Sequence, residues 1–290
     1  MAVVTAFLLE RTVSRLCAPG GRGLPDHPLS VPDPPPTSRG EHGSRCVDRR
    51  FARQCRIADP RQPTVPTTLR SAVPELPYRP PPDHGLRVVH RDAALLVVDK
   101  PAGLLAVPGR GEARHDCLAS RVRTDYPEAR VVHRLDMATS GLLVFARDGE
   151  SQRRLGQAFA ERRVHKGYVA IVAGRIPAAG LIELPLAADW PNRPRQKVDL
   201  AGRPALTRYA ALDHDPATDR TRVVLFPETG RTHQLRVHLA AIGHPILGDA
   251  LYGADEIVSG NGRLLLHAEW LSFVHPYSGE TIALDSPPPF

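Results

Sequence analysis

The sequence is poor in cysteine and has no long apolar run. Its four cysteines, at positions 17, 46, 55 and 117, form no CxxC pair, which argues against a disulfide scaffold. No apolar run reaches the roughly 20 residues of a membrane-spanning helix. The apolar start, residues 2–9, lacks the preceding positive charge and the cleavage pattern of a secretory signal. We expect a cytoplasmic protein, with an organelle transit segment as the alternative, because the first stretch contains arginine and few acids.

Lysine is also scarce. Only Lys100, Lys166 and Lys197 are lysines among 38 basic residues, so nearly every cation is an arginine. Arginine suits bidentate phosphate contacts, although a G+C-rich genome produces the same bias. The net charge of +7 divides into +4 for residues 1–77 and +3 for residues 78–290. A nucleic-acid surface on the second part must therefore come from local clusters.

The composition changes near residue 77. The first 77 residues contain 12 prolines and 11 arginines and show little periodicity. Such a segment buries too little apolar surface to offset its conformational entropy. We therefore predict a disordered extension over 1–77 and one catalytic domain over 78–290, a division that suits a chain of 290 residues.

From residue 86 the pattern becomes that of a folded domain. Short apolar runs bounded by turn residues predict strands at 95–98, 142–146, 168–172, 222–226 and 264–266. Stripes at helical spacing predict helices over 151–163, with Ser151 as the cap, and over 232–242, with Gly243 as the stop. Strands joined by hairpin-like turns, with few helices, favour an α+β fold with a largely antiparallel sheet.

The most informative stretch is residues 131–141. It places Arg134 and Asp136 two residues apart in a loop that leads into the apolar strand 142–146. A loop held between strands is a common place for a catalytic group. An isolated aspartate before a turn is, however, ordinarily a turn or cap residue. The amino-acid sequence of the whole loop decides between these interpretations.

The loop sequence, HRLDMATSG, resembles the signature loop of the RluA family of RNA pseudouridine synthases. The resemblance implies that Asp136 is the catalytic nucleophile and that Arg134 fills the place of a base flipped out of its stack. Residues 165–168 resemble the family's K-x-Y element, in which Tyr168 packs on the target base. Residues 230–238 resemble the GRTHQLRVH block, in which Arg236 pairs with the nucleophile, and we expect a bidentate clamp on Asp136. Residues 101–103 and 263–268 match two further blocks, the second of which we expect to support the site.

Residues 189–197 look like an insert of one member of this family rather than of the family as a whole. We expect this loop to bind RNA, because Trp190 can stack on a base and three cations surround it. These cations are Arg193, Arg195 and Lys197. A second basic cluster, around the predicted helix, is equally well explained as a solvated helix face. It comprises Arg153, Arg154, Arg162, Arg163 and Lys166.

The family resemblance implies that uridines in a tRNA anticodon loop and in 23S ribosomal RNA are isomerised to pseudouridine. This reaction breaks a C–N bond and forms a C–C bond at one sugar, so it needs neither a cofactor nor a metal. We expect a monomer whose partner is structured RNA. The same resemblance implies the pseudouridine synthase fold, with its mixed sheet and flanking helices.

Two rival classes of protein remain on sequence grounds. A non-catalytic RNA-binding or RNA-folding protein on the same scaffold would have lost Asp136, Tyr168 or Arg236, and all three are present. A carboxylate hydrolase would need a second acid near Asp136. The nearest aspartates along the chain are Asp125 and Asp148, and neither lies in a block that suggests this role. A zinc site is disfavoured, because the histidines at 233 and 238 are not spaced to share one helix face.

Overall fold

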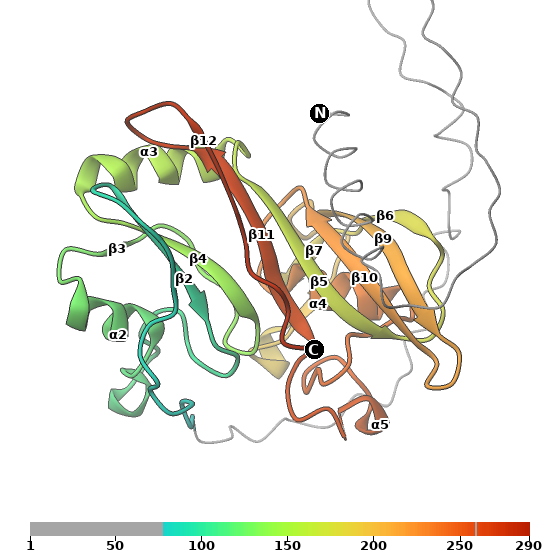
Figure 1. Ribbon diagram of the computed structural model, residues 1–290. Coiled ribbons are helices and arrows are strands. Elements are labelled where there is room, and N and C mark those ends of the chain that lie inside the picture. The colour runs from blue at the N-terminus through green and yellow to red at the C-terminus, as the bar shows by residue number, and fades with distance from the viewer. Residues whose placement is uncertain (1–77, 259) are drawn as a thin grey trace, which may run out of the picture. The chain divides into compact units, whose positions relative to one another are not determined.

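The computed structural model describes residues 78–258 and 260–290, which form a ten-stranded mixed sheet with helices packed against it (Figure 1). The predicted disordered extension, 1–77, lies outside the described residues. The strands of the large sheet are β1 (Val88–Arg91), β2 (Leu95–Lys100), β3 (Arg130–Val131), β4 (Ser140–Ala146), β5 (His165–Ala173), β6 (Ala179–Glu183), β9 (Leu206–Asp215), β10 (Arg220–Pro227), β11 (Leu266–Val274) and β12 (Thr281–Asp285). A second, two-stranded sheet consists of β7 (Leu186–Ala188) and β8 (Gln196–Val198).

The large sheet is antiparallel except at one place. Its strands follow the order β1-β2-β4-β11-β5-β10-β9-β6, with β12 beside β11 and β3 beside β4. Among the described strands, only β4 and β11 pair in parallel, where Ser140 and Gly141 lie opposite His267 and Ala268. The predicted α+β class with a largely antiparallel sheet is therefore confirmed. The parallel pair also fixes the residues that directly follow the Asp136 loop.

The helices are α2 (Leu118–Asp125), α3 (Gly149–Ala160), α4 (Gln234–Ala241) and α5 (Asp255–Val258), with short 3-10 turns η2 (Glu112–Arg114) and η3 (Trp190–Asn192). Helices α2 and α3 cover opposite faces of β2 and β4, because alternate side chains of a strand point to opposite sides. Leu96 and Leu143 pack in the core beneath α2, whereas Val97 and Val144 pack against Leu155 of α3. These strands are consequently buried on both faces.

Helix α4 covers the other half of the sheet. Its predicted apolar stripe is confirmed, since Leu235 and Leu239 pack with Leu225 of β10. Gly243, with φ +86°, follows the helix end as predicted. Tyr168 of β5 contacts both the core beneath α4 and the core beneath α2. The side chain of Tyr168 thus lies at the junction between the two halves of the sheet.

Several predicted boundaries need correction. The helix predicted over 151–163 ends at Ala160, the helix predicted over 232–242 spans Gln234–Ala241, and the strand predicted over 168–172 begins at His165. The cap of α3 is Asp148 rather than Ser151, because the helix begins two residues earlier than predicted, and the Asp148 carboxylate accepts the Ser151 N–H at 2.8 Å. Strand β11 begins at Leu266, whereas Leu264 and Leu265 are buried residues that precede it.

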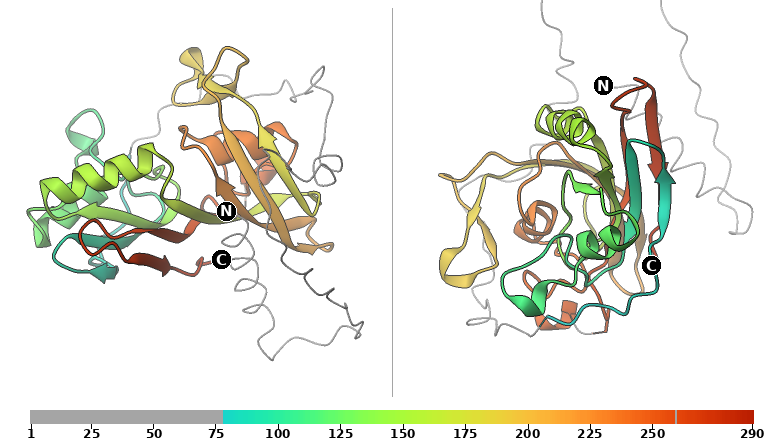
Figure 2. Two further views of the ribbon diagram at one scale, coloured as in Figure 1. Left: turned by 90° about the horizontal axis from the view of Figure 1, so that it is seen from above. Right: turned by 90° about the vertical axis from the view of Figure 1, so that its left-hand side faces the viewer.

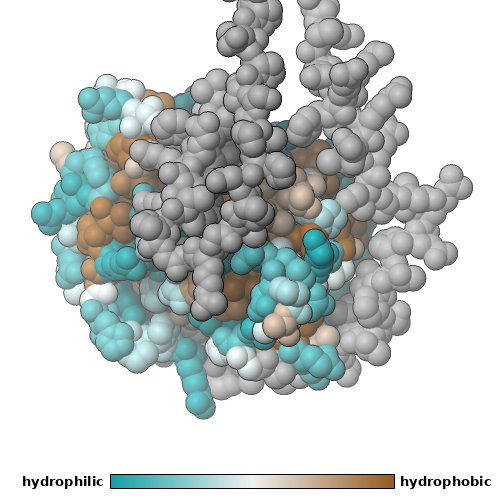
Figure 3. Space-filling view, turned by 45° about the vertical axis from the view of Figure 1, so that its right-hand side comes forward, coloured by the Kyte–Doolittle hydropathy of each residue, from teal (hydrophilic) through white to brown (hydrophobic). Residues whose placement is uncertain are grey.

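The predicted RNA-binding loop forms a hairpin of β7, η3 and β8 that projects from the large sheet (Figure 2). Its base is anchored on α4, because Leu186 of β7 packs with Val237. None of the described helices is long and apolar enough to span a membrane. On the face drawn in Figure 3, hydrophilic and hydrophobic residues are interspersed over the described surface.

We predict that Gly141→Ala lowers the free energy of unfolding by about 3 kcal/mol. Gly141 has φ +113°, which an L-residue rarely adopts, and an added Cβ would overlap the carbonyl oxygen of Ala268 across the parallel pair. Urea unfolding followed by circular dichroism measures the change.

Gly156→Ala is the matched control. Gly156 lies inside α3, where an added Cβ meets nothing within 4 Å, so this variant should be stabilised by about 0.5–1 kcal/mol. An unchanged urea midpoint for Gly141→Ala would contradict the close approach of β4 and β11.

Candidate active site

Asp136 lies in the loop between β3 and β4, and the backbone of this loop is fixed on both sides of it. The Thr139 N–H donates to the carbonyl of Asp136 at 3.1 Å, and the carbonyl of Met137 accepts the N–H of Gly103 at 2.9 Å. The Asp136 side chain is 23% exposed. The loop therefore has a fixed backbone and a carboxylate that a substrate can reach.

Lys100, at the end of β2, ties this loop to the turn that follows the strand. It is fully buried, and its Nζ donates to the carbonyls of Pro101 at 2.9 Å, Leu104 at 2.7 Å and Met137 at 3.0 Å. Burial lowers the pKa of Lys100 to about 7, while the charge of Asp136 acts in the opposite direction. Three acceptors match the three N–H groups of an ammonium, so the geometry accommodates the charged form. Our sequence interpretation treated this region only as a turn and missed the role of Lys100.

His133 supports the loop from the other side. Its Nε2 accepts the N–H of Val144 at 3.1 Å, and its ring stacks on Phe159 of α3 with centroids 4.5 Å apart. Burial lowers the pKa of His133 to about 3, so the imidazole is neutral. A neutral ring is the form that can accept the backbone N–H, and His133 therefore acts as a fixed support.

Arg236 of α4 is brought to Asp136, as predicted, but its strongest contacts go elsewhere. Its Nη1 lies 3.7 Å from Asp136 Oδ2. The bidentate clamp expected on Asp136 is instead made to Asp249, with Nε–Oδ2 at 2.8 Å and Nη2–Oδ1 at 2.7 Å. Burial opposes the charge of Arg236, yet the hydrogen bonds and charge of Asp249 raise the pKa of Arg236 overall. Arg236 is thus a permanent cation held by one carboxylate and presented to another.

Asp249 is a site residue that our sequence interpretation missed. Its side chain is fully buried, and Oδ1 also accepts the N–H groups of Leu251 at 2.9 Å and Tyr252 at 3.2 Å. It is a second acid near the site, although along the chain it lies much farther from Asp136 than Asp125 or Asp148 does. Because its oxygens are occupied by Arg236 and the backbone, it is not free to act as the second acid of a hydrolase.

Tyr168 lies close enough to Asp136 for the two groups to interact electrostatically. Burial and the charge of Asp136 raise the pKa of the Tyr168 phenol well above its ordinary value. The phenol is consequently protonated throughout the neutral range, which makes it a hydrogen-bond donor rather than a ready base.

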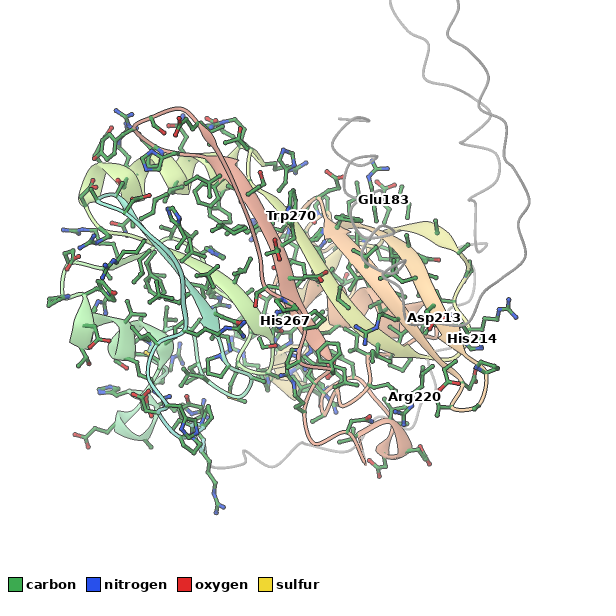
Figure 4. All side chains as sticks on the ribbon, viewed as in Figure 1. Glu183, Asp213, His214, Arg220, His267 and Trp270 are labelled. Carbon is green, nitrogen blue, oxygen red and sulfur yellow. The ribbon has the colours of Figure 1, made fainter. Side chains whose placement is uncertain are left out.

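The residues around 263–268 support the parallel pair. Ser140 Oγ lies 2.7 Å from His267 Nδ1 and accepts a hydrogen bond from Arg263 at 2.5 Å. His267 Nε2 lies 3.0 Å from the carbonyl of Ser286, so both ring nitrogens are engaged. Figure 4 labels His267 on β11, between the two halves of the sheet. This arrangement agrees with the supporting position expected for this block.

The residues expected to contact RNA divide into exposed and buried ones. Arg134 is exposed beside Asp136. In the hairpin, Trp190 is 68% exposed and the guanidinium carbon of Arg193 lies 3.5 Å from its ring centroid. Lys197 is also exposed and pairs with Asp199 at 3.0 Å. These side chains form an exposed, basic and aromatic hairpin surface.

Arg195 does not belong to this exposed surface. It is 5% exposed, and its backbone closes the hairpin turn by accepting the Asp189 N–H and donating to the Asn192 carbonyl, both at 3.0 Å. A charge count along the sequence does not reveal that this side chain is buried. Direct RNA contact by Arg195 is therefore not favoured by the structure.

Three of the five cations of the second basic cluster pair with glutamates. Arg153 and Arg154 both pair with Glu150, at 2.8 and 2.7 Å, and Arg163 pairs with Glu161 at 2.6 Å. Such exposed pairs are typical of a solvated helix surface. The geometry of this cluster therefore supports its interpretation as a solvated helix face.

Comparison with known proteins identifies the family. The sequence model described as RNA pseudouridylate synthase matches residues 94–241. The Dual-specificity RNA pseudouridine synthase RluA of Escherichia coli (strain K12) is 50% identical over 216 residues, covering 73% of this chain and 98% of that protein. Its namesake from Pasteurella multocida (strain Pm70) is 46% identical over 215 residues, with the same coverage. The chain belongs to the RluA family of RNA pseudouridine synthases.

A solved structure of the family agrees with this assignment. Human RNA Pseudouridylate Synthase Domain Containing 1 superimposes with a TM-score of 0.61 at 32% identity, over 73% of this chain and 87% of that chain. The protein is therefore an RNA pseudouridine synthase, and none of these comparisons supports the non-catalytic alternative. The residues of the 131–141 loop, β5 and α4 that the family resemblance singled out lie together in one site.

We predict that Arg236→Lys reduces kcat about a hundredfold and lowers the free energy of unfolding by about 3 kcal/mol. A single ammonium cannot hold both oxygens of Asp249 and also face Asp136, so one of the two carboxylates loses its partner. Single-turnover kinetics and urea unfolding measure the two effects.

Arg154→Lys is the control for the loss of a guanidinium, because Arg154 makes an exposed pair with Glu150 on α3. It should leave both kcat and stability nearly unchanged. Wild-type kcat in Arg236→Lys would show that the guanidinium fork is not required.

Proposed function

We propose that this enzyme isomerises uridines in a tRNA anticodon loop and in a 23S ribosomal RNA stem-loop, with Asp136 as the nucleophile. The observation that carries the proposal is the position of the Asp136 carboxylate, partly exposed and facing Arg236 in a loop held by the core. The word dual-specificity in the names of the bacterial relatives supports activity on more than one RNA substrate. The two RNA classes are those that the family resemblance implies.

The chemistry requires a nucleophile, a proton acceptor and a pocket that excludes water. Asp136 forms a transient bond to the uracil C6 or to the sugar C1′, the C1′–N1 bond breaks, and the base turns. A C1′–C5 bond then forms, and the bond to Asp136 breaks with its electron pair returning to the carboxylate. The C5 proton leaves and N1 gains a proton, so atoms and electrons balance without a cofactor. An aspartate is ionised at neutral pH without an activating base, and the nearby guanidinium of Arg236 offsets the cost of its partial burial.

Access to the uridine requires base flipping, because a stacked base cannot reach Asp136. We propose that Arg134, which is exposed and two residues from Asp136, occupies the vacated position, as the family resemblance implies. Trp190 and Arg193 of the hairpin offer a stacking platform and a phosphate contact for the flanking strand. We also propose that residues 78–290 form the catalytic domain and that the protein acts as a monomer.

We predict that Asp136→Asn abolishes isomerisation while RNA affinity stays within about threefold of wild type. The carboxylate acts in the chemistry, whereas affinity derives mainly from phosphate contacts. Tritium release from C5-labelled uridine RNA and filter binding measure the two properties.

Asp125→Asn makes the same chemical change at an exposed position in α2 and should retain full tritium release. Tritium release by Asp136→Asn at a rate close to that of wild type would rule out Asp136 as the nucleophile.

We predict that Tyr168→Phe lowers kcat about tenfold without changing KM, since the ring still stacks but one donor to the reacting groups is lost. Because burial raises the pKa of Tyr168, its phenol is protonated at every pH below its ordinary value near 10. Any rise of kcat between pH 8 and 10 in the wild type should therefore also be present in Tyr168→Phe. A rise that is present in the wild type and absent in Tyr168→Phe, measured by pH-rate profiles, would instead assign Tyr168 as the general base.

A further inference from the structure

A histidine that the family motif includes but that has no assigned role lies against the nucleophile. His233 precedes α4 with φ +54°, in the left-handed region that few non-glycine residues occupy. Its side chain is 11% exposed, and its Nε2 lies 4.0 Å from Asp136 Oδ1. Arg236 faces the other oxygen, Oδ2, at 3.7 Å. The two carboxylate oxygens of Asp136 therefore face two different nitrogen groups.

The other ring nitrogen of His233 is held by Tyr252. His233 Nδ1 lies 2.7 Å from Tyr252 Oη, and the two rings meet edge to face with centroids 5.7 Å apart. The ring of Tyr252 also lies beneath the guanidinium of Arg236, 5.1 Å from centroid to carbon. One tyrosine thus contacts both groups that face Asp136.

The hydrogen bonds define the proton positions. Tyr252 Oη accepts the backbone N–H of Gln196 at 2.8 Å, so its own hydrogen is available for His233 Nδ1. Burial raises the pKa of Tyr252 and lowers the pKa of His233, which keeps the phenol protonated and the imidazole neutral. A neutral imidazole that accepts at Nδ1 carries its hydrogen on Nε2, the nitrogen that faces Asp136.

Gln196 is the first residue of β8, in the hairpin that carries the exposed Trp190 and Arg193. A continuous chain of contacts therefore runs from the hairpin backbone through Tyr252 and His233 to the nucleophile. The last step of this chain is 4.0 Å long, and hydrogen bonds of a catalytic site are often long before substrate binds and tighten in the substrate complex.

We propose that His233 is a positioning residue, an inference that rests on the proposed function. Its Nε2–H orients Asp136 through Oδ1. Tyr252, anchored on the hairpin residue Gln196, holds the imidazole in the required tautomer.

The test uses the full chain and compares His233→Asn with Tyr252→Phe. Asparagine tolerates the left-handed backbone and can still accept from Tyr252, but it is too short to reach Asp136. Phenylalanine keeps the ring beneath Arg236 and removes only the hydroxyl. Each variant should lose about tenfold in kcat, the effect of one hydrogen bond to a carboxylate, with KM unchanged. Tyr252→Phe should also lower the melting temperature, because the Gln196 N–H loses its acceptor. Because both changes break the same chain, the double variant should also lose only about tenfold.

Tyr277→Phe is the matched control, since it also removes one phenol hydroxyl, in this case an exposed one that donates to the carboxylate of Asp148. It should keep wild-type kcat. A kcat within twofold of wild type in either test variant, or a loss of about a hundredfold in the double variant, overturns the proposal.

A second measurement does not depend on activity and so separates this proposal from the proposed function. Nitrogen-15 NMR of histidine-labelled protein, assigned with His233→Asn, should show the Nε2–H tautomer for His233 in wild type and a mixture of tautomers in Tyr252→Phe. An Nδ1–H tautomer in wild type overturns the proposal, whether or not the protein isomerises uridine.

Discussion

The active site depends on one buried cation between two carboxylates. Arg236 is 5% exposed, Asp249 is fully buried, and Asp136 is the partner that remains open to substrate. A buried charge without a partner costs several kcal/mol, so Asp249 fixes the guanidinium before any substrate arrives. The positive charge that Asp136 experiences is therefore part of the folded structure and does not have to be assembled during the reaction.

The packing of the sheet explains how these groups are placed. Helix α4 supplies Arg236 because its leucines pack on β5 and β10, and the turn that supplies Asp249 follows Gly248, where φ is +75° and an added Cβ would overlap the carbonyl of Arg263. The Asp136 loop is held from the other half of the sheet by Lys100 and by the parallel pair of β4 with β11. Residues from three distant parts of the chain thus meet at the junction where Tyr168 lies.

Much of this could be predicted from sequence, because the groups nearest the reaction lie in contiguous motifs. The sequence predicts the loop of Asp136, the strand that contains Tyr168 and the helix that contains Arg236, although β5 begins three residues earlier than predicted and α4 begins two residues later. The burial of Arg236 was not evident from periodicity, since six consecutive residues of α4 are buried, Gln234, Leu235, Arg236, Val237, His238 and Leu239. Asp249 was missed because its role exists only through a partner 13 positions earlier in the chain. The exposure of the hairpin cations depends on how its turn packs, so Arg195 could not be distinguished from Arg193.

The central claim is that this arrangement isomerises uridine with protein groups alone. The most direct measurement is nucleoside analysis by liquid chromatography and mass spectrometry of an unmodified tRNA anticodon stem-loop after incubation with the purified chain and a metal chelator. The account predicts that one uridine is replaced by an isomer of identical mass whose base resists release from the sugar, as a C–C glycosidic bond requires. Recovery of all uridine unchanged in the chelator, with conversion restored by an added metal ion, would contradict it.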